Sequence, residues 1–293
     1  MLAMRRWVPA AALAVVLLAA APTALAGIVV TREFKSTALA RSWTYAVYLP
    51  TGYDTSDLRY PALYLLHGSG GNLYQWVNQG RIQQTADALI ASGDIPPAVI
   101  VMPDAGTSWF VDRKEKMETA IITDLIPDVE KSLRVLRSRD GRLVGGLSMG
   151  GYGAMRFALK YPELFAAAAL LSPAIYNPEP PENSVARAAG VFGAPVYDAS
   201  VWKSLNYPAL WEGYLAKKNA VPMYINSGDD DDFFTEFEAV QFYELLRKNK
   251  QPAELRIVNG AHAWTVWEST IGDALKYIFR YSARPAMATP SRR

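Results

Sequence analysis

The chain has 293 residues, which is enough for one large domain with a substantial core, and its composition gives no reason to divide it. It contains no cysteine, which excludes disulfides and a thiol nucleophile, and its two histidines argue against a structural zinc site. The formal net charge is +2, so the chain lacks the concentrated basic surface that nucleic-acid binding requires. We therefore expect no metal, no cofactor and no nucleic-acid partner.

Residues 1–26 have the pattern of a secretory signal peptide. An arginine pair forms the positive segment, residues 8–21 form the apolar segment, and Ala24-Leu25-Ala26 is a small-x-small cleavage site. The apolar run is short for a membrane span and contains Pro9, so a transmembrane anchor is the weaker interpretation. We expect export to the periplasm or out of the cell, with no stable membrane anchor after cleavage. The oligomeric state stays open.

The rest of the chain alternates between strand-like and helix-like segments. Two β-rich runs come first and are expected to pair as antiparallel strands. Buried apolar strands then alternate with helices, which predicts an α/β fold, a mostly parallel sheet with helices on both faces, in one domain over residues 27–281. The predicted strands are residues 27–34, 43–49, 60–66, 98–102, 143–147, 165–171, 221–226 and 254–258, and the predicted helices are residues 83–91, 119–133, 151–160, 235–250 and 265–279.

Two segments depart from this alternation. Residues 175–220 contain several prolines and scattered aromatic residues, a pattern typical of a binding loop or lid. A short helical excursion that packs on the sheet is a compatible interpretation. Residues 282–293, with two prolines and two terminal arginines, are expected to form a disordered tail.

The most informative motif is Gly146-Leu147-Ser148-Met149-Gly150, which lies between a predicted strand and a predicted helix. G-x-S-x-G in this context is the signature of a nucleophile elbow, a turn so tight that its neighbours must be small. The competing interpretation is a glycine-rich turn that closes an ordinary βα unit. We predict that Ser148 is a nucleophile exposed at the edge of the sheet.

A serine hydroxyl needs a base to remove its proton, and the base needs a group that orients it. In this fold the order along the chain is Ser, acid, His, which makes His262, after the last strand, the expected base. His67 precedes the serine and is expected to hold an oxyanion loop through hydrogen bonds, and it is also a candidate for contact with substrate. The acid is expected among four consecutive aspartates that follow residues 221–226, and spacing alone does not choose among Asp229, Asp230, Asp231 and Asp232.

Ester cleavage places negative charge on the carbonyl oxygen, and two backbone N–H groups can stabilise it. One is expected from Met149, the residue after the nucleophile, and the other from the loop after His67, from Ser69 or next from Gly68. Aromatic residues near the catalytic loops are candidates for stacking on a sugar or a phenolic ring, although plain packing is an equal alternative. These candidates are Trp76, Trp109, Tyr152, Trp264 and Trp267.

Several motifs together resemble the esterase D-like family of the α/β-hydrolase superfamily. They are the run from Leu143 through Gly146-Leu147-Ser148-Met149-Gly150-Gly151-Tyr152-Gly153-Ala154 to Tyr161-Pro162-Glu163-Leu164-Phe165, and also Leu65-Leu66-His67-Gly68, Val101-Met102-Pro103-Asp104, Asp124-Leu125-Ile126-Pro127 and Leu171-Ser172-Pro173. The family includes feruloyl and acetyl-xylan esterases, S-formylglutathione hydrolases and mycolyltransferases. Its G-x-x-D pattern favours Asp231 as the acid, Gly260-Ala261-His262 matches its histidine motif, and Ser69 is implied as an oxyanion donor.

The resemblance implies a serine esterase that needs no cofactor and acts on carboxylic esters. With an export signal, we expect a carbohydrate-linked acetyl or feruloyl ester, or a small acyl ester, as the substrate. Alternatives are an acyltransferase of the same fold and a thioesterase like the S-formylglutathione hydrolases. A non-catalytic binding module is disfavoured, because serine, histidine and a carboxylate are all present.

Overall fold

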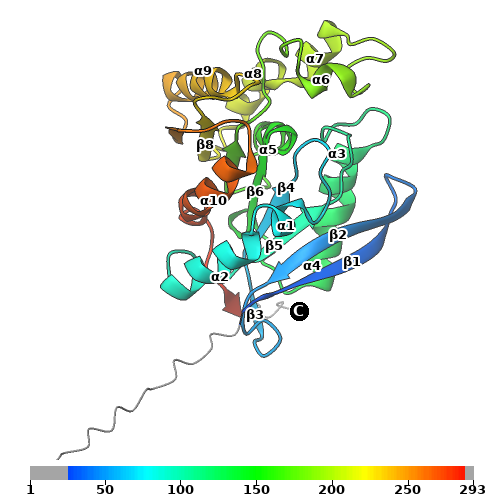
Figure 1. The fold of residues 1–293 in the computed structure, drawn as a ribbon. Coiled ribbons are helices and arrows are strands. Elements are labelled where there is room, and N and C mark those ends of the chain that lie inside the picture. Colours follow the sequence, from blue (N-terminus) through cyan, green and yellow to red (C-terminus); the bar gives the residue numbers. More distant parts are fainter. Residues whose placement is uncertain (1–25, 288–293) are drawn as a thin grey trace, which may run out of the picture.

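The computed structural model describes residues 26–287, so the predicted signal peptide lies outside the described residues except for its last residue. Its centre is an eight-stranded sheet with the order β1-β2-β5-β4-β6-β7-β8-β9 (Figure 1). The strands are β1 Ile28–Ser36, β2 Arg41–Leu49, β4 Ala62–Leu66, β5 Val99–Pro103, β6 Arg142–Leu147, β7 Ala167–Leu171, β8 Met223–Gly228 and β9 Ala253–Val258. β2 pairs antiparallel with both β1 and β5, and all other pairs are parallel.

Helices cover both faces of this sheet. They are α1 Gln75–Asn78, α2 Ile82–Ser92, α3 Met117–Thr119, α4 Ile126–Ser132, α5 Met149–Lys160, α6 Val185–Ala188, α7 Ala199–Leu205, α8 Tyr207–Lys217, α9 Thr235–Lys248 and α10 Trp264–Phe279. Buried residues of α2 and α10 form one apolar cluster, and those of α4, α5, α8 and α9 form another. Among the described residues, no helix is long and apolar enough to cross a membrane.

The strands separate the two clusters because successive side chains point to opposite faces of a sheet. In β4, Leu63 and Leu65 join the cluster of α2 and α10, whereas Tyr64 and Leu66 join the cluster of α5. A strand buried on both faces has no polar face, which explains the continuous apolar runs in the sequence. The predicted fold class, a mostly parallel sheet with helices on both faces, is therefore confirmed.

The predicted helix over residues 119–133 is divided into three segments. A π-helical turn over Ala120–Leu125 separates α3 from α4, and the N–H of Ile126 donates to the carbonyl oxygen of Ile121, five residues back. The next residue is Pro127, which has no N–H to continue an α-helical ladder. The helix predicted over residues 119–133, with a kink or a restart expected at Pro127, therefore restarts as α4 at Ile126.

Residues 175–220, which we call the insertion, contain α6, α7 and α8, joined by irregular segments. Trp202 of α7 is buried, its ring stacks on that of Tyr152 at 5.5 Å, and its Nε1–H donates to the carbonyl oxygen of Tyr176. Phe192 also contacts Tyr152 of α5, and Tyr207 and Trp211 contact Phe242 of α9, so these aromatic residues pack on neighbouring helices as the helical interpretation expects. Only Val185 of this segment lines the pocket beside Ser148.

The predicted disordered tail is wrong for its first six residues. The N–H of Ala283 donates to the carbonyl oxygen of Asp140, and β10 (Ala286–Met287) pairs antiparallel with β3 (Leu58–Arg59). The backbone N–H and C=O groups of this segment are paired with distant parts of the chain. The local sequence therefore does not predict the pairing. Residues 288–293 lie outside the described residues.

Candidate active site

Ser148 lies at the turn between β6 and α5 with φ 52° and ψ −115°, a conformation that few non-glycine residues adopt. A Cβ on Gly146 would lie 2.5 Å from the backbone of Gly150, and one on Gly150 would lie 2.4 Å from the carbonyl oxygen of Leu66. The turn therefore closes only with glycine at both positions. It holds the serine hydroxyl at the carboxyl edge of the sheet, as the G-x-S-x-G motif predicts.

Ser148, His262 and Asp231 form one hydrogen-bonded chain. The Ser148 Oγ lies 2.9 Å from His262 Nε2, and His262 Nδ1 lies 2.6 Å from Asp231 Oδ2. Because an ionised carboxylate only accepts, Nδ1 carries the proton and Nε2 is left to accept from the serine hydroxyl. Edge-on contacts with the rings of Phe233 and Trp267, both at 4.9 Å, hold the imidazole from two sides.

The four consecutive aspartates lie in different environments. Asp231 is 3% exposed, whereas the other three are exposed. Asp229 accepts from the N–H of Gly260 at 3.0 Å, and the N–H of Asp230 donates to the carbonyl oxygen of Gly260. These bonds join the loop after β8 to the loop after β9 and bring Asp231 to His262. The geometry therefore selects Asp231 from the run.

The environment of Asp231 affects the pKa of its carboxyl in two opposite directions. Burial raises the pKa, but the hydrogen bond and the charge of His262, with donors from Thr235 and Phe233, outweigh it and hold the pKa below its usual value. The Thr235 hydroxyl donates to Oδ2 at 2.6 Å, and the Phe233 N–H donates to Oδ1 at 2.9 Å. Asp231 therefore stays ionised and fully hydrogen-bonded where it meets the imidazole.

The loop after β4 is fixed by Gln75 and His67. The N–H of Gly68 donates to Gln75 Oε1 at 3.0 Å, so this amide is occupied and Ser69 is left as the expected oxyanion donor of the loop. Ser69 lines the same pocket as Ser148. The N–H of Met149 is the first of α5, where an amide has no intrahelical acceptor. Both amides predicted from the sequence thus border the serine.

His67 is buried, and its ring forms hydrogen bonds that hold this loop instead of contacting substrate. Its Nε2 accepts from the N–H of Ala105 at 3.0 Å, so Nδ1 carries the proton and donates to the carbonyl oxygen of Gly68 at 2.8 Å. Burial lowers the pKa of His67, which keeps the ring neutral and both bonds intact. The prediction that His67 contacts substrate was wrong, and the expected loop-holding bonds are present.

Ser148 opens into a pocket of about 240 Å³. Its wall is mostly apolar and aromatic. The lining residues are Gly68, Ser69, Gln75, Leu147, Ser148, Val185, Phe233, His262, Trp264 and Trp267. The pocket can hold a compact apolar or aromatic group against the serine hydroxyl.

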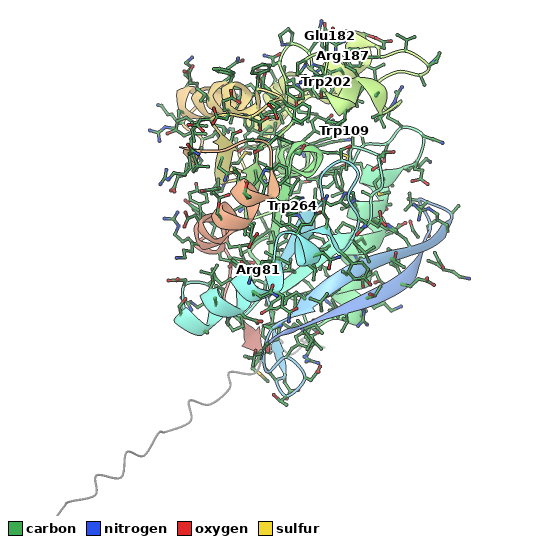
Figure 2. The ribbon with its side chains drawn as sticks, in the orientation of Figure 1. Arg81, Trp109, Glu182, Arg187, Trp202 and Trp264 are labelled. Carbon is green, nitrogen blue, oxygen red and sulfur yellow. The ribbon has the colours of Figure 1, made fainter. Side chains whose placement is uncertain are left out.

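Of the aromatic residues predicted to contact substrate, Trp264 and Trp267 line this pocket and three do not. Trp76 is 1% exposed and donates its Nε1–H to the carbonyl oxygen of Leu66. Trp109 and Tyr152 are also buried and pack with Trp202, so Trp109 lies beside the insertion while Trp264 lies by α10 (Figure 2). The three buried residues are part of the core, which is the packing alternative that the sequence left open for them.

The pocket also contains residues that sequence reasoning missed. Phe233 follows the aspartate run directly, and its position between the acid and α9 was a usable signal. Gln75 follows the His67-Gly68 motif by a few residues and Val185 lies in α6, and no local pattern indicates that either lines the pocket. Their contribution depends on how the loop after β4 and the segment before α7 fold over the serine.

A mostly parallel sheet in which an interior strand ends at a strained serine is the arrangement that defines the α/β-hydrolase class. Residues 36–278 match the family described as "Putative esterase", and the chain belongs to this family.

Named relatives agree with this assignment. The chain is 36% identical over 156 residues to an "Endo-1,4-beta-xylanase/feruloyl esterase" of Xylanibacter ruminicola, which covers 50% of this chain and 22% of that protein. It is 25% identical over 241 residues to an "Acetyl esterase" of Caldicellulosiruptor saccharolyticus, covering 78% of this chain and 86% of that protein. The chain spans about a fifth to about half of the length of the first curated relatives that it matches.

Solved structures show the same fold. One described as "ferulic acid esterase" superimposes with a TM-score of 0.74 and 28% identity, covering 87% of this chain and 98% of that one. The similarity extends over nearly the whole of both chains.

Proposed function

We propose that this protein is a serine esterase that hydrolyses carboxylic esters linked to carbohydrate, with a hydroxycinnamoyl group of the feruloyl type as the preferred acyl group and acetyl as the next candidate. The observation that carries the proposal is the hydrogen-bonded chain from Ser148 through His262 to Asp231, which opens into an aromatic pocket. The relatives named feruloyl esterase and acetyl esterase support the substrate class.

The proposed reaction has two steps. His262 Nε2 takes the proton of the Ser148 hydroxyl while Oγ attacks the ester carbonyl carbon, and the alcohol leaves with the proton that His262 returns. Water then attacks the acyl-enzyme, gives a proton to His262, and the acid is released as Ser148 regains its proton. Asp231 holds the imidazole and stabilises its charged form.

The N–H groups of Ser69 and Met149 are proposed to stabilise the oxyanion of each tetrahedral intermediate. Removal of one such donor typically costs about 10²- to 10³-fold in turnover. Gln75 and His67 act as positioning residues here, because they hold the backbone of the loop that presents Ser69. Phe233, Trp264 and Trp267 surround the acyl group, which favours an aromatic ring over an aliphatic chain.

The test is a comparison of initial rates on methyl ferulate, p-nitrophenyl acetate, a longer p-nitrophenyl ester, acetylated xylan and S-formylglutathione. Ser148→Ala is the blank. We expect hydrolysis of methyl ferulate at the highest kcat/KM, and loss of activity on every ester in the variant. Preference for the thioester would reject the proposed substrate class, and activity that persists in Ser148→Ala would reject the proposed nucleophile.

We also propose that the protein is exported. The proposal rests on the charge, the apolar segment and the cleavage pattern of residues 1–26. Expression of the full chain in a bacterial host, followed by fractionation and N-terminal sequencing, tests it. A mature protein that begins at Gly27 outside the cytoplasm is expected, and an uncleaved chain in the cytoplasm would contradict it.

A further inference from the structure

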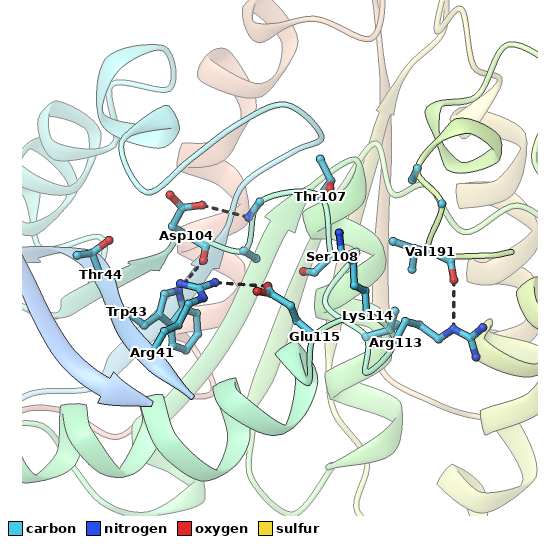
Figure 3. A pocket seen from close by; sticks show the side chains of 15 residues that line it. Arg41, Trp43, Thr44, Asp104, Thr107, Ser108, Arg113, Lys114, Glu115 and Val191 are labelled. Atoms are coloured by element: carbon cyan, nitrogen blue, oxygen red, sulfur yellow. Dashed lines mark hydrogen bonds and ion pairs between the residues drawn. The ribbon is translucent and has the colours of Figure 1, made fainter. Parts of the chain in front are cut away.

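A second recess, larger than the pocket of Ser148, lies on the same edge of the sheet (Figure 3). Its volume is about 450 Å³, against about 240 Å³ for the pocket of Ser148. We call it the distal recess. It is lined by residues of four segments: Arg41, Trp43 and Thr44; Asp104, Ala105, Gly106, Thr107 and Ser108; Val111, Arg113, Lys114 and Glu115; and Ala189, Gly190 and Val191.

The position of the distal recess follows from the strand directions. Residues 104–108 come directly after β5, and β2 is antiparallel to β5, so the start of β2 lies beyond the carboxyl end of β5. The distal recess therefore opens at the carboxyl edge of the sheet, where ligands of α/β folds bind. No residue lines both this recess and the pocket of Ser148.

One side chain, His67, links the walls of the two spaces. Its Nε2 accepts from the N–H of Ala105, which lines the distal recess, and its Nδ1–H donates to the carbonyl oxygen of Gly68, which lines the pocket of Ser148. A lining residue of each space is thus bonded to the same imidazole ring. A ligand in the distal recess lies close enough to belong to the same substrate as an acyl group at Ser148.

The lining of the distal recess is polar and mixed in charge. Arg41 pairs with Glu115 at 3.4 Å, Arg113 donates to the carbonyl oxygen of Val191, and Asp104 accepts from the N–H of Gly106 (Figure 3). Among the described residues, the Thr107 hydroxyl and the Lys114 amine have no hydrogen-bond or ion-pair partner.

Such a wall offers donors and acceptors side by side. Sugar hydroxyls both donate and accept, so a saccharide can satisfy groups of either kind. An apolar ligand would leave the same groups unpaired, at a cost for each of them. The chemistry of the wall therefore matches a polyhydroxylated ligand.

The sizes of the two spaces support a division of the substrate between them. Drug-sized ligands occupy pockets of about 300–1,000 Å³, so the pocket of Ser148 is small and the distal recess falls inside this range. The first has room for an acyl group alone. The alcohol part of a carbohydrate ester must extend out of it along the edge of the sheet.

We propose that the distal recess binds glycosyl residues of the alcohol part of the substrate, beyond the sugar that carries the cleaved ester. The proposal rests on the proposed function of Ser148 and extends it to a second binding site. Saccharide bound there raises the occupancy of long substrates without touching the reacting atoms. Its effect is therefore on KM for saccharide esters and not on small esters.

The first test fills the distal recess. Thr107 is exposed and its side chain makes no bond, so Thr107→Trp blocks the space without removing a contact. We expect KM for a feruloylated xylo-oligosaccharide to rise about tenfold, because one or two net hydrogen bonds to the saccharide are lost. The kcat/KM for methyl ferulate should stay within about twofold. The control is Thr55→Trp, at an exposed threonine outside both spaces whose hydroxyl donates only within its own turn, to the carbonyl oxygen of Gly52 at 3.2 Å, and it should change neither value.

An unchanged KM for the saccharide ester in Thr107→Trp, or an equal loss on methyl ferulate, would overturn the proposal. The second test is binding of xylotetraose, which carries no ester, to the full chain with Ser148→Ala. Calorimetry should give a measurable Kd that weakens about tenfold when Thr107→Trp is added. Absence of binding, or the same Kd in both proteins, would also overturn it.

These two tests separate this proposal from the proposed function. Hydrolysis of methyl ferulate without any binding of xylotetraose keeps the esterase and rejects the saccharide site. Binding of xylotetraose by a protein that hydrolyses no ester keeps the site and rejects the esterase.

Discussion

Ser148 adopts a backbone conformation that costs free energy, and its neighbours maintain it. The N–H of Ser148 donates to the carbonyl oxygen of Leu171 at 2.8 Å, and the N–H of Tyr152 donates to the carbonyl oxygen of Ser148. Glycine at 146 and 150 lets the backbone approach closely enough for the turn to keep these bonds, because a Cβ at either position would meet backbone atoms. The strain therefore serves to aim one hydroxyl at His262.

At the same scale, Asp231 is expected to matter far more than its neighbours. Asp231→Asn leaves the shape intact but favours the wrong tautomer of His262, so we expect kcat to fall by about 10⁴-fold. Asp229→Asn keeps an oxygen that can accept from Gly260, and Asp230→Asn changes an exposed side chain, so each should stay within about threefold. Steady-state rates on methyl ferulate measure all three.

Comparable losses in the three variants would mean that the run acts through its summed charge. Circular dichroism of each variant is the control, because a folded Asp231→Asn protein is needed to assign the loss to His262.

Among the elements, α5 is anchored by a buried ionic group under its second half. Glu118 of α3 is 1% exposed, and its Oε2 accepts from Arg156 Nε at 2.6 Å while Oε1 accepts from the Tyr161 hydroxyl at 2.7 Å and from Lys160. Burial raises the pKa of Glu118, but the charge of Arg156 and the three hydrogen bonds outweigh it and keep the pKa low. Arg156 also donates to the carbonyl oxygen of Leu205, which joins α3, α5 and the insertion.

Loss of this carboxylate should destabilise the fold. Glu118→Gln leaves the guanidinium of Arg156 buried without a counter-charge, and the free energy of unfolding should fall by about 3–5 kcal/mol. Glu163→Gln is the matched control, because Glu163 pairs with Lys217 at 3.1 Å on the surface and should cost about 0–1 kcal/mol. Urea unfolding of both variants makes the comparison, and equal losses would contradict the anchoring role of Glu118.

For the molecule as a whole, Glu238 makes the free energy of unfolding depend on pH. It lies on α9 and accepts from the N–H of Asn177 at the start of the insertion, at 3.0 Å. Burial raises its pKa to about 7, and the bond from Asn177 lowers it only in part. From about pH 4.5 to about pH 7 the folded protein therefore holds a proton that the unfolded chain has released.

A proton bound more tightly by the folded state makes stability fall as the pH rises through this window and level off above it. Glu238→Gln removes the titration, so the decrease in unfolding free energy between about pH 5 and about pH 8 should be smaller than in the wild type. Urea unfolding of the wild type and of Glu238→Gln at both pH values measures this decrease. The lowered pKa of Asp231 acts below this range, and the lowered pKa of His67, which makes stability rise with pH, acts equally in both proteins, so neither changes the comparison. The same decrease in both proteins would show that Glu238 is not its source.

The local sequence was sufficient for the sheet and for the positions of Ser148 and His262. Apolar runs bounded by turn residues predict buried strands, because such runs have no polar face to turn to water. Since parallel strands all end at one edge, residues that follow strands gather there, whatever their separation along the chain. Ser148 and His262 both follow predicted strands, and the structure has both at that edge.

Contacts between distant segments decided the rest. An aromatic residue leaves water equally well in a core or against a ligand, so Trp76, Trp109 and Trp264 look alike in the sequence although only Trp264 lines the pocket of Ser148. The bond from Gly68 to Gln75 and the four-segment wall of the distal recess depend likewise on how loops pack over the sheet edge. Periodicity reports whether a side chain is buried, and only the folded chain determines what it is buried against.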